Sequence, residues 1–577
     1  MCGITAYYGD RETCEILLDS MKRLEYRGYD SAGIAVLSKP KISVRKDTGK
    51  LDEIEGKLNH GNSKSRAGIG HTRWATHGNV SEKNAHPHTS CDGRFALVHN
   101  GIIENWEKLK EGLGEHEFQS ETDSEVAAHY IEERAKNKGT EKAIRDFMRE
   151  AAGSYAIALL DSEEDRLFAV KSGSPMAIGM GEKEIFLASD VYAFSPYTDK
   201  VTFMKDGEYA VVEDCDIVVK NTRGEEVGKR VETIRWEQDD SGKGAFDHYM
   251  QKEITEIPRS LEKLQNSLET DQRDTLRRFT EKLKDCGKVI FTAAGTSYHA
   301  SLLGVYFLQK AGVEAQALIA SEFENYERVD ENTLLVPISQ SGETKDVLEA
   351  MDYSKQEGAE IASITNVPHS TVERKSDLNL RIRAGQELCV AATKTFTNQL
   401  YVLMKLAESI NGTKVENSLM EKIKEAIERN EGQIKKLAEE MKDEKDVYII
   451  GKGETYPVAR EIALKLKEIS YIHAEGMMGG ELKHGTLALV EDGTPVISLI
   501  PGKGSDIISN VKEAESRGAK IIEVSPDYGD FYVPENSNGD FAFFSSVLGF
   551  LLTYWTARKK GLPVDKPRNL AKSVTVQ

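Results

Sequence analysis

A cysteine follows the initiator methionine directly, at position 2 of the chain. Removal of Met1 would place a thiol and a free α-amine on one residue. Because the reference pKa of an α-amine is roughly 7.7 to 8.0, that amine can act as general base for the thiol beside it, as in N-terminal nucleophiles. Taken alone, Cys2 is equally an incidental thiol at a frayed chain end. The choice between these alternatives depends on the rest of the chain.

A run of hydroxyl side chains forms a second candidate site. Residues Ser339 to Thr344 read Ser-Gln-Ser-Gly-Glu-Thr and follow an apolar run that predicts a buried strand. Hydroxyls and backbone amides at the start of a helix that follows a strand bind anions, phosphate in particular. Ser341 or Thr344 alone could simply cap the helix. Four hydrogen-bonding side chains within six residues exceed the needs of a cap, so this run predicts a phosphate site.

Charged residues on one predicted helix form a third candidate site. Glu461, Lys465 and Glu468 are spaced by four and then three residues, which places them on one helical face. Such a face is commonly a solvated row of salt bridges. The helix that matches it in an internal repeat is apolar instead, from Leu302 to Leu308. The contrast favours a cleft in which a carboxylate transfers protons and a lysine stabilises an oxyanion.

The bulk properties limit the functional class. A chain of 577 residues suggests three or so domains, and its net charge of −19 argues against nucleic-acid binding. The six cysteines are scattered without a Cys-x-x-Cys pair, which predicts neither a structural disulfide nor a zinc site. No signal peptide and no apolar run of about 18 residues is found. We therefore expect a soluble cytoplasmic protein without a membrane or nucleic-acid partner.

Composition and periodicity predict the elements that position these residues. Short β-type runs mixed with helices indicate an α+β domain over residues 1–235, and residues 236–245 form a polar linker. Strands that alternate with long helices then indicate parallel α/β structure. Gly295 and Gly358 recur as Gly453 and Gly518 at nearly one offset, so we infer two similar doubly wound subdomains, 246–430 and 431–560. A charged helix around residues 420–442 joins them, and residues 561–577 form a C-terminal tail.

Longer motifs extend these observations over the whole chain. In the first third they are Met1–Ile4, Leu24–Gly33, His71–Gly78, Asn84–His88, His99–Asn105 and Ser120–Asp123. In the remainder they are Ala294–Ser297, Ser339–Thr344, Ala463–Ser470, Gly480–His484 and Pro567–Val576. The chain thereby resembles the family of glutamine-dependent fructose-6-phosphate aminotransferases, the glucosamine-6-phosphate synthases. The first group resembles a class II glutamine amidotransferase domain of the N-terminal-nucleophile fold. The second resembles two sugar isomerase (SIS) domains, three-layered and flavodoxin- or Rossmann-like.

The resemblance implies a reaction and its partners. Ammonia from L-glutamine would be transferred to D-fructose 6-phosphate, and the product isomerised to D-glucosamine 6-phosphate with release of L-glutamate, as the first step of hexosamine and UDP-N-acetylglucosamine synthesis. The family uses no cofactor and no metal. It implies a homodimer in which His484 is shared across subunits, so that the residue that opens the sugar ring comes from the neighbouring copy.

For glutamine, the resemblance assigns the nucleophile to Cys2, which forms a glutamyl thioester. Asn100 and the N–H of Gly101 would form the oxyanion hole, although these two residues by themselves also match a hairpin turn. Arg73 would bind the α-carboxylate, Asp123 the α-ammonium, and Trp74 would gate the ammonia path. Glutamine would be bound by Arg73, Trp74, Thr76, His77 and Asp123.

For the sugar, the resemblance assigns Lys572 as the Schiff-base lysine, which predicts a tail that folds into a cleft. Glu468 would move the proton between C1 and C2, and Lys465 would assist at the oxygens. Sugar phosphate would be bound by Thr296, Ser297, Ser339, Gln340, Ser341, Thr344 and Val390. The family's usual cysteine and serine are replaced by Ala294 and Ala392, which removes a thiol and one sugar contact.

Four alternatives were weighed on the same residues. A metal at His86 and His88 is rejected because two histidines lack a clear third or fourth ligand. A phosphoribosyl amidotransferase also begins Cys-Gly, but it would need a diphosphate-binding loop in place of paired isomerase halves. A sugar-phosphate-sensing regulator would not need Cys2 or Glu468. A different ketose phosphate as substrate stays open.

Overall fold

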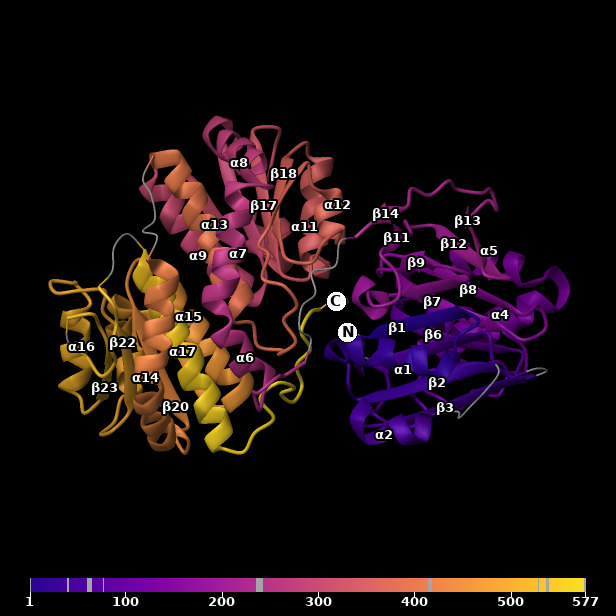
Figure 1. Ribbon diagram of the computed structural model, residues 1–577, viewed down its shortest axis with the longest axis horizontal. Helices are drawn as coiled ribbons and strands as arrows, with labels where there is room; N and C mark the ends of the chain where they lie inside the picture. The colour runs from indigo at the N-terminus through magenta and orange to yellow at the C-terminus, as the bar shows by residue number, and fades with distance from the viewer. Residues whose placement is uncertain are drawn as a thin grey trace. The chain divides into compact units, whose positions relative to one another are not determined.

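The computed structural model describes residues 2–38, 41–59, 65–75, 77–234, 242–412, 418–527, 529–535 and 539–574. The chain divides into two compact units: Met1–Gln238 with Ser573–Gln577 is unit 1, and Asp239–Lys572 is unit 2. Figure 1 draws the N-terminal part of the chain, which makes up most of unit 1, in indigo to magenta, and unit 2 in magenta to yellow. Of the predicted linker 236–245, residues 236–241 lie outside the described part of the chain.

Unit 1 contains two antiparallel sheets. The first has the order β14-β11-β9-β10-β1-β4-β2-β3 and the second β13-β12-β8-β7-β6-β5. Strands of the first are β1 (Gly3–Gly9), β2 (Ser31–Ser38), β3 (Lys41–Thr48), β4 (Ala67–Arg73), β9 (Ala177–Gly181), β10 (Glu184–Ala188), β11 (Lys200–Phe203) and β14 (Glu232–Thr233). Strands of the second are β5 (His88–Thr89), β6 (Phe95–Ile103), β7 (Gly153–Asp161), β8 (Arg166–Ser172), β12 (Glu208–Glu213) and β13 (Asp216–Asn221).

Alternation along the strands builds four layers. In β7, Ala156, Ala158 and Leu160 face the core between the two sheets, whereas Ile157 and Leu159 face a core on the outer side. Helices cover both outer sides, because the period of two in each strand leaves a second apolar face to bury. These helices are α1 (Thr13–Leu24), α2 (Leu51–Leu58), α3 (Trp106–Glu111), α4 (Asp123–Lys138) and α5 (Thr140–Glu150). Unit 1 is therefore a sheet-on-sheet sandwich between helices, as the predicted α+β class requires.

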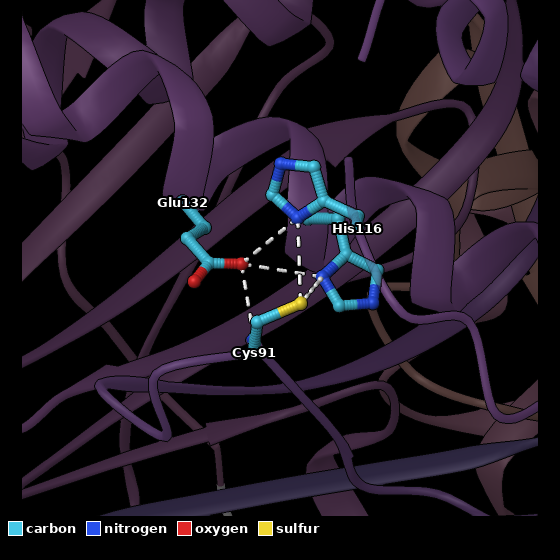
Figure 2. A group of neighbouring side chains, drawn as sticks. Cys91, His116 and Glu132 are labelled. Carbon is cyan, nitrogen blue, oxygen red and sulfur yellow. Dashed lines mark hydrogen bonds and ion pairs between the residues drawn. The ribbon is translucent and has the colours of Figure 1, made fainter. Parts of the chain in front are cut away.

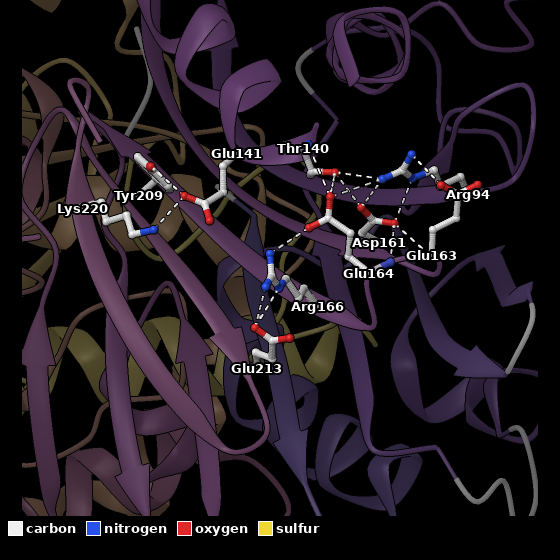
Figure 3. A network of polar contacts seen from close by, with 10 residues as sticks. All are labelled: Arg94, Thr140, Glu141, Asp161, Glu163, Glu164, Arg166, Tyr209, Glu213 and Lys220. Atoms are coloured by element: carbon white, nitrogen blue, oxygen red, sulfur yellow. Dashed lines mark hydrogen bonds and ion pairs between the residues drawn. The ribbon is translucent and has the colours of Figure 1, made fainter. Parts of the chain in front are cut away.

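A polar network ties the start of α5 to the second sheet (Figure 3). Arg94 donates from Nε and Nη2 to the two carboxylate oxygens of Asp161, at 2.9 and 2.7 Å. The hydroxyl of Thr140 donates to the same carboxylate at 2.6 Å. Asp161 is fully buried, so its charge is compensated by a fork-shaped guanidinium that matches both oxygens. The network fixes the helix onto the strand that pairs with β6.

Unit 2 contains two parallel sheets. The first parallel sheet has the order β16-β15-β17-β18-β19 and the second parallel sheet β21-β20-β22-β23. Strands of the first are β15 (Lys288–Ala293), β16 (Ala315–Ile319), β17 (Thr333–Ser339), β18 (Glu360–Thr365) and β19 (Leu378–Arg381). Strands of the second are β20 (Asp446–Gly451), β21 (His473–Met478), β22 (Pro495–Leu499) and β23 (Lys520–Val524). The predicted repeat is confirmed, because corresponding strands occupy the same places in both sheets.

Helices cover both faces of each parallel sheet. Val289 and Phe291 of β15 lie in one large apolar core with Val447 and Ile449 of β20, whereas Ile290 and Ile450 face separate cores on the far sides. The helices are α6 (Tyr249–Thr255), α7 (Ile257–Glu269), α8 (Arg273–Asp285), α9 (Gly295–Lys310), α10 (Phe323–Tyr326), α11 (Lys345–Gln356), α12 (Thr371–Lys375), α13 (Lys394–Asn411), α14 (Leu419–Met441), α15 (Thr455–Lys465), α16 (Ile508–Glu515) and α17 (Asp540–Lys559). Two three-layer subdomains thus share one central core.

Two helices test the sequence-based expectations. The charged helix predicted around residues 420–442 is α14. Helix α17 is buried along nearly its whole length, which explains why its apolar residues show no amphipathic period. Among the described helices, none combines the length and the apolar character that crossing a membrane requires.

Candidate active site

Cys2 lies at the start of β1, next to the end of β4. Its Sγ accepts a hydrogen bond from the backbone N–H of Trp74 at 3.3 Å and lies 3.4 Å from the carbonyl oxygen of the same residue. Its own carbonyl oxygen accepts from Asn100 Nδ2 at 2.9 Å. Neighbouring strands therefore fix the thiol. Its surroundings are not those of an incidental thiol at a frayed chain end.

Asn100 and Gly101 lie inside β6, so the hairpin-turn alternative is wrong. Asn100 Oδ1 is 3.0 Å from His71 Nε2, which orients the amide with its nitrogen toward Cys2. Gly101 has φ +116°, and a Cβ there would lie 1.9 Å from the backbone oxygen of Ser154. Only glycine fits this close approach. The strand thus places the side-chain amide of Asn100 beside Cys2, and its next position admits only glycine.

Arg73 and Asp123 are both buried in unit 1. The Arg73 guanidinium lies on the carbonyl oxygens of His77, Gly78 and Asn79. Burial lowers the pKa of Arg73, and the charges of Cys2, Asp30 and Asp123 act in the opposite direction. Asp123 begins α4 and accepts from the N–H of Ile103 at 2.8 Å.

The other predicted glutamine ligands have less defined surroundings. Trp74 packs edge-on against Tyr29, with ring centroids 5.5 Å apart. His77 lies in the turn that covers Arg73, and its buried Nδ1 has no partner among the described residues. Thr76 lies outside the described part of the chain.

The histidines rejected as metal ligands pack on one another. The rings of His71 and His86 are stacked with centroids 4.1 Å apart, and His86 and His88 meet edge to face. Burial lowers the pKa of His71 to about 3 and that of the other two well below the ordinary value. His86 Nδ1 accepts from the N–H of His99 at 3.1 Å. Two of these neutral rings contact β6 at neighbouring residues: His86 at His99 and His71 at Asn100.

The hydroxyl run lies between β17 and α11, as predicted. Ser339 Oγ accepts from the N–H of Gly342 at 2.9 Å and is 3.1 Å from Thr344 Oγ1. Ser341 Oγ accepts from the N–H of Glu343. Thr344 occupies the N-cap position but its side chain makes no cap hydrogen bond, so helix capping does not explain it. Gln340 is partly exposed in the same loop.

Thr296 and Ser297 begin α9, across the same sheet edge. Thr296 Oγ1 donates to Glu461 Oε1 at 3.0 Å, and Ser297 Oγ accepts from Gln399 at 3.0 Å. Val390 is buried and its N–H donates to the carbonyl oxygen of Asp565 at 3.1 Å. The first parallel sheet therefore brings two hydroxyl-bearing helix starts to its carboxyl edge, where open α/β sheets bind ligands.

The charged face of α15 is a buried cluster. Lys465 Nζ lies 3.2 Å from Glu461 and 2.7 Å from Glu468, and it donates to Thr296 Oγ1 at 2.9 Å. Glu468 lies in a π-helical turn, Leu466–Ser470, which continues α15 and brings it beside Lys465. The interpretation as a solvated row is wrong, because Glu461 and Lys465 are fully buried.

Electrostatics inside the cluster keep two groups charged. Burial alone would lower the pKa of Lys465, but the two carboxylates raise it above its ordinary value. Burial alone would raise the pKa of Glu461, but Lys465 and His299 hold it below the ordinary value. Burial raises the pKa of Glu468, against the attraction of Lys465. Glu468 is thus the carboxyl of this cluster best suited to exchange a proton.

Lys572 is buried in unit 2, with 2% of its side chain exposed. Its Nζ pairs with Glu387 and donates to the carbonyl oxygen of Cys389 at 2.8 Å. Glu387 also accepts from the N–H groups of Thr393 and Thr395. The tail therefore folds into the protein at this lysine, as expected, but its ammonium is held by a carboxylate.

His484 differs from the other predicted residues. It ends the short 3₁₀ turn Gly479–His484 and is exposed. Within the described residues no recorded contact joins it to Glu468 or Lys572. The single chain does not bring this histidine to the cluster.

Comparisons with known proteins match both units. A model for a glutamine amidotransferase domain matches residues 71–196, and a model for the SIS domain matches residues 282–409 and 440–536. A glutamine–fructose-6-phosphate aminotransferase (isomerizing) of Thermococcus kodakarensis is 44% identical over 609 aligned residues, with all of both chains covered. One of Methanothermobacter thermautotrophicus is 41% identical, again over the full length of both.

The chain belongs to the glutamine–fructose-6-phosphate aminotransferase (isomerizing) family. Among solved structures, the C-terminal domain of glucosamine-fructose-6-phosphate aminotransferase from Francisella tularensis is 34% identical, with a TM-score of 0.50. It covers 57% of this chain, and all of that domain is matched. The predicted family, its fold class and its enzymatic character are confirmed.

Several residues beside the aminotransferase site escaped the sequence-based prediction. His299 Nδ1 lies 2.8 Å from the Glu461 carboxylate, and Glu387 accepts a hydrogen bond from Lys572. Glu253 is a second buried carboxyl, close enough to Glu387 for repulsion, and it accepts from the N–H of Leu388 at 2.5 Å. Glu461 itself was predicted from the sequence, because the internal repeat matches its helix to an apolar one. Nothing in the sequence predicted Glu253 or Glu387, since each lies in a segment without a distinctive pattern.

Proposed function

We propose that this aminotransferase transfers ammonia from L-glutamine to D-fructose 6-phosphate, and isomerises the product to D-glucosamine 6-phosphate, through the residues described above. The buried cluster of Lys465, Glu461 and Glu468 beside Thr296 carries the proposal for the sugar. A lysine that stays charged next to a carboxyl with a raised pKa suits proton transfer between adjacent carbons.

For glutamine, Cys2 attacks the side-chain amide and its α-amine, free after removal of Met1, moves the protons. Asn100 Nδ2 and the N–H of Gly101 stabilise the tetrahedral oxyanion. The contact of Asn100 with the Cys2 carbonyl supports this role, because it places the amide nitrogen beside the nucleophile. Arg73 and Asp123 bind the α-carboxylate and α-ammonium, and Trp74, Thr76 and His77 complete the pocket.

For the sugar, the loop Ser339–Thr344 binds the phosphate together with Thr296, Ser297 and the backbone near Val390. Lys572 attacks the ketone at C2, water leaves, and an imine forms; the ammonia from glutamine then displaces the lysine. Because Lys572 is paired with Glu387, this step requires the ion pair to open and the ammonium to lose its proton. Glu468 moves the proton between C1 and C2, and Lys465 stabilises charge on the neighbouring oxygen.

We also propose a homodimer that shares His484. The residue is exposed on one chain, and the large apolar side chains of Met478 and Leu489 on either side of it are 48% and 62% exposed. A second copy that covers these side chains would receive His484 at its own site, where it opens the sugar ring. A cytoplasmic location belongs to the same proposal.

The domain boundaries are proposed with the function. Residues 1–235 hydrolyse glutamine, residues 246–430 and 431–560 form the isomerase, and residues 561–577 supply Lys572. The division of the chain near Gln238 supports the first boundary.

A coupled assay tests the proposal. The protein receives L-glutamine and D-fructose 6-phosphate, and glutamate and glucosamine 6-phosphate are followed together. We expect equal amounts of both products, lost in Cys2→Ala and kept in Cys215→Ala, a matched substitution of a cysteine outside the site. Glutamate without amino sugar would retain glutamine hydrolysis and reject the sugar, whereas the absence of both products would favour a regulator that only binds sugar phosphate.

A further inference from the structure

Four metal-ligating side chains of unit 1 converge away from the glutaminase residues (Figure 2). Cys91 lies in the turn between β5 and β6, His116 in the loop between α3 and α4, and His129 and Glu132 one turn apart on α4. One donor atom from each, namely Cys91 Sγ, the two Nδ1 atoms and a Glu132 oxygen, lies within 4.8 Å of every other. Three separate segments are needed to assemble this group.

Four of the six distances between these atoms match those expected between ligands of one small ion, and the other two are at most 4.8 Å. Zinc bonds of about 2.3 Å to sulfur and about 2.0 to 2.1 Å to nitrogen or oxygen give tetrahedral edges of about 3.5 Å for S···N and about 3.3 Å for N···O. Cys91 Sγ lies 3.5 Å from His116 Nδ1 and 3.6 Å from His129 Nδ1. Glu132 Oε2 lies 3.3 and 3.2 Å from the same two nitrogens.

The surroundings orient each ligand as metal sites require. The far ring nitrogens face carboxylates: His116 Nε2 is 3.4 Å from Glu133, and His129 Nε2 is 3.7 Å from Glu125. The hydrogen bond of His116 Nε2 to Glu133 favours the tautomer that leaves its Nδ1 free to bind a metal, and Glu125 places a negative charge near His129.

The ligand carboxylate is also fixed. Glu132 accepts from the N–H of Cys91 at 3.0 Å and from the N–H of Asp92 at 3.1 Å. Its side chain and those of His116 and His129 are only 2 to 3% exposed. Cys91 itself is exposed and gives an ion access from solvent.

We propose that Cys91, His116, His129 and Glu132 bind one Zn²⁺. Two imidazoles, a thiolate and a carboxylate are donor groups that zinc binds in its four-coordinate sites. A thiolate and a carboxylate also neutralise the ion, which suits a largely buried site. Four protein ligands leave no position for water or substrate, so the ion is structural rather than catalytic.

The zinc ion would link the β5–β6 turn and the α3–α4 loop to α4. That helix begins at Asp123, and the strand that follows the turn carries Asn100 and Gly101. Glu125, which faces His129, also accepts from the N–H groups of Gln119 and Ser120 and so holds the end of the loop. Loss of the metal would loosen the supports of the glutaminase site without removing a reacting group.

Metal content tests the proposal independently of the reaction. The full chain, without a histidine tag, is produced with zinc in the medium, dialysed and measured by plasma mass spectrometry. We expect about one zinc per chain in the wild type and in Cys215→Ser, and less than a tenth of that in Cys91→Ser. Because Cys91 is exposed, serine there leaves the core intact. Wild type without zinc, or Cys91→Ser with as much zinc as wild type, would overturn the site.

Cobalt provides a second, spectroscopic readout on the wild type and Cys91→Ser. Co²⁺ added to the chelator-treated protein should give a sulfur-to-cobalt charge-transfer band and the strong visible bands of four-coordinate cobalt, which Cys91→Ser should lack. The chelator should lower the midpoint of thermal unfolding of the wild type by several degrees and leave that of Cys91→Ser unchanged. Cobalt bands without sulfur character would show that Cys91 is not a ligand.

Discussion

The two parallel sheets of unit 2 share the order of four strands, but the segments that follow these strands carry different polar side chains. In the first, the loop after β17 carries Ser339 and Ser341 and leads into α11. In the second, the equivalent loop after β22 reads Pro-Gly-Lys-Gly from Pro501, whereas the helix after β20 carries Glu461 and Lys465. One scaffold therefore provides neutral hydroxyls in one copy and ionised groups in the other.

Under the proposed function, this difference divides the reaction between the two copies of the fold. Phosphate is bound by dipoles and hydroxyls at helix starts, which need not change their protonation. Proton transfer needs a carboxyl whose pKa is shifted by burial, and such a group is tolerated only beside a counter-charge. The two sets meet where Thr296 of the first copy contacts Glu461 and Lys465 of the second.

The largest effect is expected at the proton-transferring carboxyl. Glu468→Gln keeps the shape and removes the proton, so the kcat for glucosamine 6-phosphate should fall by about 10²- to 10⁴-fold, with little change in the KM for fructose 6-phosphate. Steady-state kinetics measure both constants. Glu491→Gln, an exposed position beside β22, is the matched control, and an unchanged kcat in Glu468→Gln would move proton transfer away from the second copy.

The phosphate loop should show the opposite kinetic signature. Ser341→Ala removes one hydrogen bond to a charged group, so the KM for fructose 6-phosphate should rise about 10-fold or more while kcat changes little. Ser505→Ala makes the same substitution in the equivalent loop of the second copy and should leave KM unchanged. Equal effects of the two substitutions would break the asymmetry between the copies.

The contact between the copies should contribute to stability. Glu461→Gln leaves His299 and Lys465 without their shared carboxylate, and removing one partner of a buried ion pair costs about 3 kcal/mol. We expect the midpoint of thermal unfolding to fall by about 5 °C or more. The exposed Glu475→Gln in β21 should change it by much less; a similar small change in Glu461→Gln would mean that the copies are held together by apolar packing alone.

The last prediction concerns how the free energy of unfolding depends on pH through the carboxylates near Lys572. Burial, with repulsion from Glu387, raises the pKa of Glu253 to about 8. A carboxyl whose folded pKa exceeds its unfolded value of about 4.3 binds its proton more tightly when folded, so this stabilisation is complete below pH 4 and is lost as pH rises through 8.

Glu253→Gln removes that dependence. Relative to wild type, the variant should gain stability as pH rises from 5 to 8, by at most about 1.4 kcal/mol per pH unit. Thermal unfolding at pH 5, 7 and 9 measures the difference, with the exposed Glu262→Gln as control. A difference that does not vary with pH would place the titrating proton elsewhere, and the second copy's cluster around Lys465 would be the next to test.

Much of this architecture could be predicted because it depends on local pattern. Short β-type runs predicted the strands of the first domain, and the recurrence of Gly295 at Gly453 predicted two similar subdomains. Motifs such as Ser339–Thr344 also carry their own geometry, since a strand, a turn and a helix start are contiguous in sequence. The π-helical turn at Leu466–Ser470 could not be predicted, because it follows from the packing that brings Glu468 beside Lys465.

The sequence by itself determined the family, the layered fold classes and the types of side chain available for chemistry. Tertiary structure alone decided which of those side chains meet. Glu387 of the first subdomain contacts Lys572 of the C-terminal tail, and Cys91 reaches His116 and His129 from another segment. The reason is physical: hydrogen-bonding and periodicity act over a few residues, whereas contacts between distant segments depend on strand order and helix packing.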